Sequence, residues 1–154
     1  MIKQEKFLCL DYGEKRVGVA VGLAEEGGEA MAFPRPALIR TTRQALFERL
    51  LALLAEEAPD VLVLGLPVRQ DGSESLTTRQ VRNFAASLRR RCDLPIYFMD
   101  ETLSSAEAEN RLRESGHTDL HASRASGLID SQAAVGILES FLNLAPERWV
   151  PAGD

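Results

Sequence analysis

The chain has 154 residues, of which 45% are hydrophobic and 27% are charged, a balance that suits one globular domain over residues 1–154. Its formal net charge of -5 argues against a generally basic nucleic-acid-binding surface, although a local basic groove beside an acidic metal site would fit that charge. No apolar run approaches the roughly 20 residues of a membrane span, and no signal segment precedes the first apolar run. We therefore expect a cytoplasmic protein that does not bind membranes.

Two strands joined by a tight turn are expected at the beginning of the chain. Residues 7–13 (FLCLDYG) and 16–22 (RVGVAVG) are apolar runs separated by a glycine-containing turn, a pattern typical of a β-hairpin. Gly18 and Gly22 in the second run indicate a bulge or the close approach of another element. Residues 32–40 (AFPRPALIR) predict a third strand, whose prolines confine its first half to an edge or an irregular segment.

The middle of the chain alternates between helices and buried strands. Residues 41–58 carry leucines at helical spacing behind a threonine cap, and Pro59 would end that helix. Residues 60–67 (DVLVLGLP) and 94–101 (LPIYFMDE) are apolar runs of the kind found in parallel strands covered on both faces. Residues 76–92 predict a helix between them, which would form a right-handed crossover.

Two further helices and a tail complete the pattern. Residues 104–116 begin with a capping box and residues 128–144 carry an apolar stripe, so both segments are expected to be helical. Residues 145–154 are expected to be a C-terminal tail. The order of elements predicts an α/β domain with a mixed five-stranded sheet, in which two parallel strands follow three antiparallel N-terminal strands.

Three acidic residues stand at the ends of predicted elements. Asp11 and Glu101 end buried strands, and Asp130 lies in the first turn of the last helix, on or beside its apolar stripe. Taken singly, an acid in such a place also serves as a turn residue or as a charge at a helix N-terminus. Together at one end of a sheet, the three would suit Mg²⁺ or Mn²⁺, and a pair of such ions about 4 Å apart promotes phosphodiester hydrolysis. Lys15 and Arg16 would then bind the phosphates of the substrate.

Four motifs follow one another along residues 7–144: LDYGEKRVGVAVG, VLGLPVRQDGS, DETLSSAEAE and IDSQAAVGILESFL. Together they resemble the YqgF/RuvX family of Holliday-junction-resolvase-like nucleases, which have the ribonuclease-H-like fold with helices on both faces of the sheet. The resemblance implies that Asp11, Glu101 and Asp130 are catalytic and metal-binding, and that Mg²⁺ or Mn²⁺, as two ions, supports cleavage of a nucleic-acid backbone. It also implies one of two substrates, the 5′ end of pre-16S rRNA or a Holliday junction.

Other side chains carry weaker indications. Arg79 and Arg82 share a face of the helix predicted over residues 76–92 and would contact nucleic-acid phosphates, although a solvated helix face explains them at least as well. Trp149 would stack on a base or, more simply, pack the tail onto the domain. Cys9 and Cys92 are expected to be reduced thiols.

Two alternative functions stay open at this point. A non-catalytic nucleic-acid- or protein-binding module in transcription or ribosome assembly would fit the negative charge but would not explain the three acids. An ATP-hydrolysing or sugar-kinase-like domain would share the first motif, but such enzymes bind the nucleotide between two lobes. Resolution of a four-way junction would require a two-fold symmetric homodimer, because the junction has two equivalent scissile strands, whereas RNA processing would not.

Overall fold

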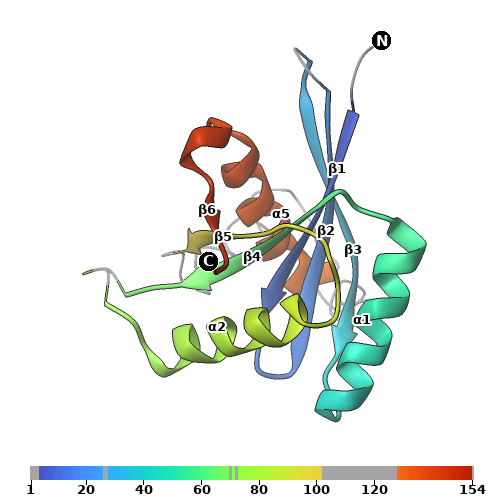
Figure 1. Ribbon diagram of the computed structural model, residues 1–154, viewed down its shortest axis with the longest axis vertical. Coiled ribbons are helices and arrows are strands. Elements are labelled where there is room, and N and C mark those ends of the chain that lie inside the picture. Colours follow the sequence, from blue (N-terminus) through green and yellow to red (C-terminus); the bar gives the residue numbers. More distant parts are fainter. Residues whose placement is uncertain (1–3, 26–27, 70, 72, 102–127, 154) are drawn as a thin grey trace.

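The computed structural model shows a six-stranded sheet with helices on both faces (Figure 1). It describes residues 4–25, 28–69, 71, 73–101 and 128–153, and it describes residues 128–130 without their side chains. The strands are β1 (Gln4–Tyr12), β2 (Arg16–Glu25), β3 (Ala30–Ile39), β4 (Val61–Pro67), β5 (Ile96–Glu101) and β6 (Val150–Pro151). The helices are α1 (Arg43–Glu57), α2 (Leu76–Arg89), α5 (Leu128–Leu142) and a short 3-10 helix, η1 (Pro146–Arg148). The helix predicted over residues 104–116 lies outside the described residues.

The strand order β3-β2-β1-β4-β5-β6 confirms the predicted mixed sheet. β1 pairs antiparallel with β2, and β2 pairs antiparallel with β3, so the first three strands form the expected antiparallel unit. β4 runs parallel to both β1 and β5, as a helical crossover requires. The proline-containing strand β3 lies at the edge of the sheet, where proline is tolerated. Within the described part of the chain, none of the helices has the length and apolar character to cross a membrane.

The prediction of five strands was wrong, because the expected tail contributes a sixth. After α5 the chain folds back, and β6 pairs with β5 in the antiparallel direction. The Ala152 N–H donates to the Ile96 carbonyl at 2.8 Å. Trp149 packs as the tail interpretation predicts, with its ring 4.6 Å from that of Phe141. A strand of two residues is too short to show the apolar–polar alternation that predicts strands from sequence, so only its pairing with β5 identifies it.

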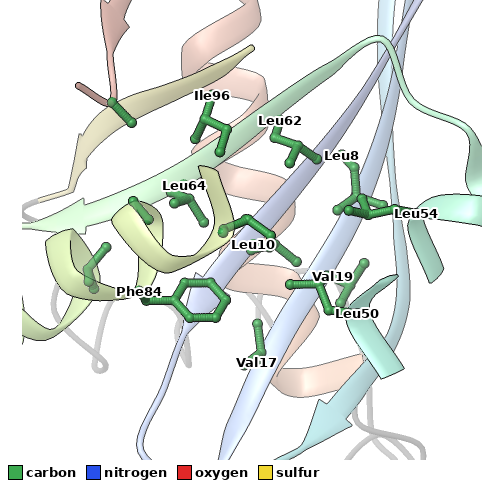
Figure 2. Close-up of a cluster of buried hydrophobic side chains, with 14 of the residues drawn as sticks. Leu8, Leu10, Val17, Val19, Leu50, Leu54, Leu62, Leu64, Phe84 and Ile96 are labelled. Carbon is green, nitrogen blue, oxygen red and sulfur yellow. The ribbon is translucent and has the colours of Figure 1, made fainter. Parts of the chain in front are cut away.

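The sheet separates two apolar cores. α1 and α2 cover one face, and Figure 2 shows side chains of this first core: Leu8, Leu10, Val17, Val19, Leu50, Leu54, Leu62, Leu64, Phe84 and Ile96. α5 covers the other face, and the second core includes Phe7, Cys9, Ala20, Val63, Ala134, Ile137, Leu138 and Phe141. Because side chains alternate along β1, Asp11 continues the row that faces α5, whereas Tyr12 continues the row that faces α1 and α2.

The two glycines of β2 mark the bulge and the close approach that the sequence predicts. The pairing of β2 with β3 shifts its register between Val17 and Val19, at the position of Gly18. A Cβ atom at Gly22 would lie 2.8 Å from Cδ2 of Leu138, so the missing side chain lets α5 lie directly on β2.

Glu57, the last residue of α1, ties that helix to two strands. Its carboxylate accepts from Nζ of Lys6 on β1 and from Nε of Arg35 on β3, each at 3.0 Å. Burial works against the charge of Glu57, but the hydrogen bonds from Lys6 and Arg35 outweigh this effect and lower the pKa of the carboxyl. The ionised side chain therefore stabilises the contact between α1 and the sheet.

We expect Glu57→Gln to lower the free energy of unfolding by about 1 kcal/mol near neutral pH, because the amide loses two charge-assisted contacts. Since the folded-state pKa is lowered, this contribution is complete above the unfolded-state value of about 4.3 and is lost as the pH falls through the folded-state value. Urea unfolding at about pH 7 and about pH 3 measures the change, and the difference between variant and wild type should shrink at the lower pH. Glu56→Gln, at the exposed neighbouring residue, is the matched control. An equal difference at both pH values would contradict the ion-pair explanation.

Candidate functional site

Asp11 lies near the end of β1, on the face of the sheet that α5 covers. It pairs across the strands with Gly18, at the bulge of β2. Its side chain follows that of Cys9 in the row facing α5, and Asp11 is half-buried. The carboxylate therefore stands where the apolar row reaches the end of the sheet.

Glu101 ends β5 and reaches the same face. A Cβ atom built on Gly65 of β4 would lie 3.6 Å from Oε2 of Glu101 and 2.6 Å from Cδ1 of Ile137 on α5. The Glu101 carboxylate thus lies over β4 beside α5, and the absent side chain of Gly65 lets Ile137 approach the strand closely. Asp100 is exposed, and strand alternation directs it to the opposite face. Of the two adjacent acids, the sheet brings only Glu101 to the side of Asp11.

The Cys9 thiol lies close to both carboxylates. Cys9 is completely buried, and its burial raises the pKa of the thiol well above the ordinary value. The negative charges of Asp11 and Glu101 raise that pKa further. The charges of two acids that are far apart in sequence thus act on the same thiol. The thiol is free, as the sequence predicts for a reduced cysteine.

The beginning of α5 is held beside the same end of the sheet. The Ser131 hydroxyl accepts from the Val19 N–H at 3.1 Å and donates to the Arg35 carbonyl oxygen. Val19 borders the bulge at Gly18, which is the residue that pairs with Asp11. Asp130 precedes Ser131 in the helix, so its backbone lies next to this bulge. The side chain of Asp130 lies outside the described part of the chain.

Sequence reasoning missed the contacts of the Ser131 hydroxyl and the role of Gly65. The signal for Gly65 is a glycine inside an otherwise apolar strand, which often marks the close approach of another group. No local pattern signals the Ser131 contact, because its partners belong to β2 and β3.

The donor set fits a divalent cation with oxygen ligands. Carboxylate oxygens are the ligands that Mg²⁺ and Mn²⁺ prefer, and Asp11 and Glu101 both bring a carboxylate to this face of the sheet. Among the described side chains, no three Asp, Glu, His or Cys residues form a group that could hold a metal. A third ligand would have to come from outside these side chains, and Asp130 is the acid that the sequence predicts there.

The predicted phosphate-binding residues Lys15 and Arg16 lie in and beside the turn between β1 and β2. Lys15 is exposed, and Arg16 is half-buried as the first residue of β2. The Gly13 N–H donates to the Arg16 carbonyl at 3.0 Å and closes the turn. The turn thus holds the cation of Lys15 at the same end of the sheet as Asp11.

The other two predicted phosphate-binding residues, Arg79 and Arg82, are exposed on α2. Arg82 forms an ion pair with Glu74 at 3.0 Å, and its guanidinium lies 5.3 Å from the centre of the Phe98 ring. Arg82 therefore helps to pack α2 against β5.

Comparison with known proteins identifies relatives over almost the whole chain. The RuvX family, described as Holliday junction resolvase, matches residues 5–144. A protein of Nitratidesulfovibrio vulgaris (strain DSM 19637 / Miyazaki F), named "Putative pre-16S rRNA nuclease", is 50% identical over 147 residues, which are 96% of this chain and 99% of that protein. A protein of Lawsonia intracellularis with the same name is 43% identical and covers 94% of this chain and 98% of its own length.

A solved structure shares the fold. Thermus thermophilus RuvC superimposes with a TM-score of 0.53 over 95% of this chain and 99% of that chain, at 15% sequence identity. The same protein in complex with a Holliday junction substrate gives a TM-score of 0.53 at 16% identity. This similarity confirms the predicted ribonuclease-H-like fold.

We expect Ser131→Ala to lower the free energy of unfolding by about 1–3 kcal/mol, because it leaves the buried N–H of Val19 without its acceptor. Denaturant unfolding measures the change. Ser140→Ala, at an exposed serine of the same helix, should change stability by less than about 0.5 kcal/mol. Equal stability of the two variants would mean that the Ser131 hydroxyl does not hold α5 at the bulge.

Proposed function

The chain belongs to the RuvX family, and from that premise we propose that it is a divalent-metal-dependent nuclease that processes the 5′ end of pre-16S rRNA. The observation that carries the proposal is the position of Asp11 and Glu101, which two separate strands bring to the face of the sheet that α5 covers. Acids placed in this way without an ion would repel each other, whereas a bound cation would stabilise both.

The residues of the site would have different roles. Asp11, Glu101 and Asp130 would hold two Mg²⁺ or Mn²⁺ ions, which when bound supply an activated water and stabilise the leaving oxygen. Rigid strands position Asp11 and Glu101, and the apolar core beneath them lowers the local dielectric, so that charges there interact strongly. The exposed cation of Lys15 would bind a substrate phosphate close to the acids.

The curated relatives favour RNA over a DNA junction as the substrate. Those between 43% and 52% identical to the chain carry the pre-16S rRNA nuclease name over almost their entire length. The similarity to junction-bound RuvC is only 16% in sequence and supports the shared fold alone. A junction-resolving enzyme would in addition need a two-fold symmetric dimer.

We expect Asp11→Asn, Glu101→Gln and Asp130→Asn each to reduce cleavage of a pre-16S rRNA 5′ leader in Mn²⁺ by about 100-fold or more, because each removes a charged ligand. Gel analysis of the cleaved RNA measures activity, and calorimetry with Mn²⁺ should show weaker binding by the same variants. Asp100→Asn is the matched control, since this exposed acid is directed to the other face and should keep full activity.

The substrate is tested by offering the leader RNA and a four-way DNA junction side by side, with Mn²⁺, to wild type and Asp11→Asn. Cleavage of the RNA by wild type alone supports the proposal. Paired symmetric nicks in the junction, without RNA cleavage, would replace RNA by branched DNA and imply a dimer. If neither is cut and Mn²⁺ does not bind, the nuclease proposal is overturned in favour of a non-catalytic binding module.

A further inference from the structure

Four arginines gather on the face of the sheet opposite the acids. Arg40 follows β3, Arg43 begins α1, and Arg90 and Arg91 directly follow α2. We call these four residues the arginine cluster. Arg43, Arg90 and Arg91 are exposed, and Arg40 is half-buried. Segments far apart in sequence therefore place four permanent positive charges beside one another.

Three members of the arginine cluster contact Phe47, Ser87 or both. The guanidinium groups of Arg43 and Arg91 both lie over the ring of Phe47, at 5.3 and 4.1 Å from its centre. Arg43 and Arg90 both donate to the Ser87 hydroxyl. The contacts join the beginning of α1 to the end of α2, and they hold the three charges in fixed positions.

Arg40 connects the arginine cluster to the turn between β1 and β2. Its guanidinium lies 4.3 Å from the centre of the Tyr12 ring and donates to the Glu14 carbonyl at 2.9 Å. Its backbone N–H donates to the Lys15 carbonyl at 2.9 Å. A hollow of about 100 Å³ opens here, lined by Tyr12, Arg40, Thr42, Arg43 and Phe84 among others.

The arginine cluster is not neutralised by direct ion pairs in the described part of the chain. Among the described residues, none of its four members forms an ion pair, although acids outnumber cations in the chain, 23 to 18. The first turn of α1, which adds the partial positive charge of a helix N-terminus, contains no acid. Charge concentrated in this way attracts anions strongly, and more so on a protein that is acidic elsewhere.

We propose that the arginine cluster binds backbone phosphates of the RNA substrate at a distance from the cleavage site. The proposal rests on the nuclease function proposed above. The last residues of β1 connect the two surfaces, because Asp11 faces α5 and Tyr12 faces the arginine cluster. An RNA strand crossing this end of the sheet, past Lys15, would meet the acids on one side and the arginines on the other.

The contact would be to phosphates and not to bases. The aromatic rings nearby, Tyr12 and Phe47, are already covered by guanidinium groups and do not offer a free face for base stacking. Arginine forms bidentate hydrogen bonds with phosphate oxygens. Such contacts do not depend on the base sequence. Binding at this surface should therefore depend on salt and be independent of sequence.

The test measures affinity for the leader RNA from about 50 to 200 mM salt, with Asp11→Asn as the parent protein so that the RNA stays intact. We expect Arg43→Gln, Arg90→Gln and Arg91→Gln each to reduce the slope of log K against log salt by about 0.7–1, because each removes one phosphate contact. An RNA of unrelated sequence should lose affinity to the same extent. Arg43→Lys, which keeps the charge, should keep most of the slope.

Arg148→Gln is the matched control, since it removes the charge of an exposed arginine on η1, outside the arginine cluster. Thermal unfolding checks that the variants fold. Arg90→Gln remains informative if the variants of Arg43 and Arg91 prove unstable, because Arg90 donates to the Ser87 hydroxyl and does not lie over the Phe47 ring. An unchanged slope in folded Arg90→Gln, or the same loss in Arg148→Gln, would overturn the proposal. Cleavage is measured separately with protein that keeps Asp11. A failure of the proposed nuclease function is then distinguished from a failure of phosphate binding by the arginine cluster.

Discussion

β1 is buried on both faces, and the positions of both functional surfaces follow from this constraint. The strand lies between β2 and β4, with α5 on one side and α1 and α2 on the other. Its side chains must therefore be apolar and fit one core or the other until the strand reaches the end of the sheet. There the last two, Asp11 and Tyr12, emerge on opposite faces. At this end of the sheet the polar side chains of the strand therefore begin where the apolar alternation of β1 ends.

The core beneath the two acids is uncharged. Because burial and the neighbouring carboxylates raise its pKa, the Cys9 thiol stays protonated at neutral pH and packs as a small apolar side chain. The missing side chain of Gly65 lets Ile137 and the Glu101 carboxylate lie against β4. Two carboxylates on one face of the sheet above an apolar core make this end of the sheet a favourable place for a cation.

The distribution of charge also separates the two faces. The acids stand on the side of α5, whereas the arginine cluster lies on the side of α1 and α2 and is stabilised by the aromatic rings beneath it. A chain with a net charge of -5 can therefore present a strongly positive surface. This arrangement would draw a polyanion toward the end of the sheet and leave the rest of the surface repulsive to it.

The order and type of the elements from β1 to α5, the edge position of β3 and the candidate acids could be inferred from the sequence, because alternation, capping and helical spacing are local properties. Strand alternation even decides between Asp100 and Glu101 once the strand is known. The sixth strand, the docking of Ser131 on the bulge and the arginine cluster could not be inferred in this way. Each depends on segments distant in sequence that meet only after the sheet and its two cores have formed, so their partners are specified by packing and not by any local pattern.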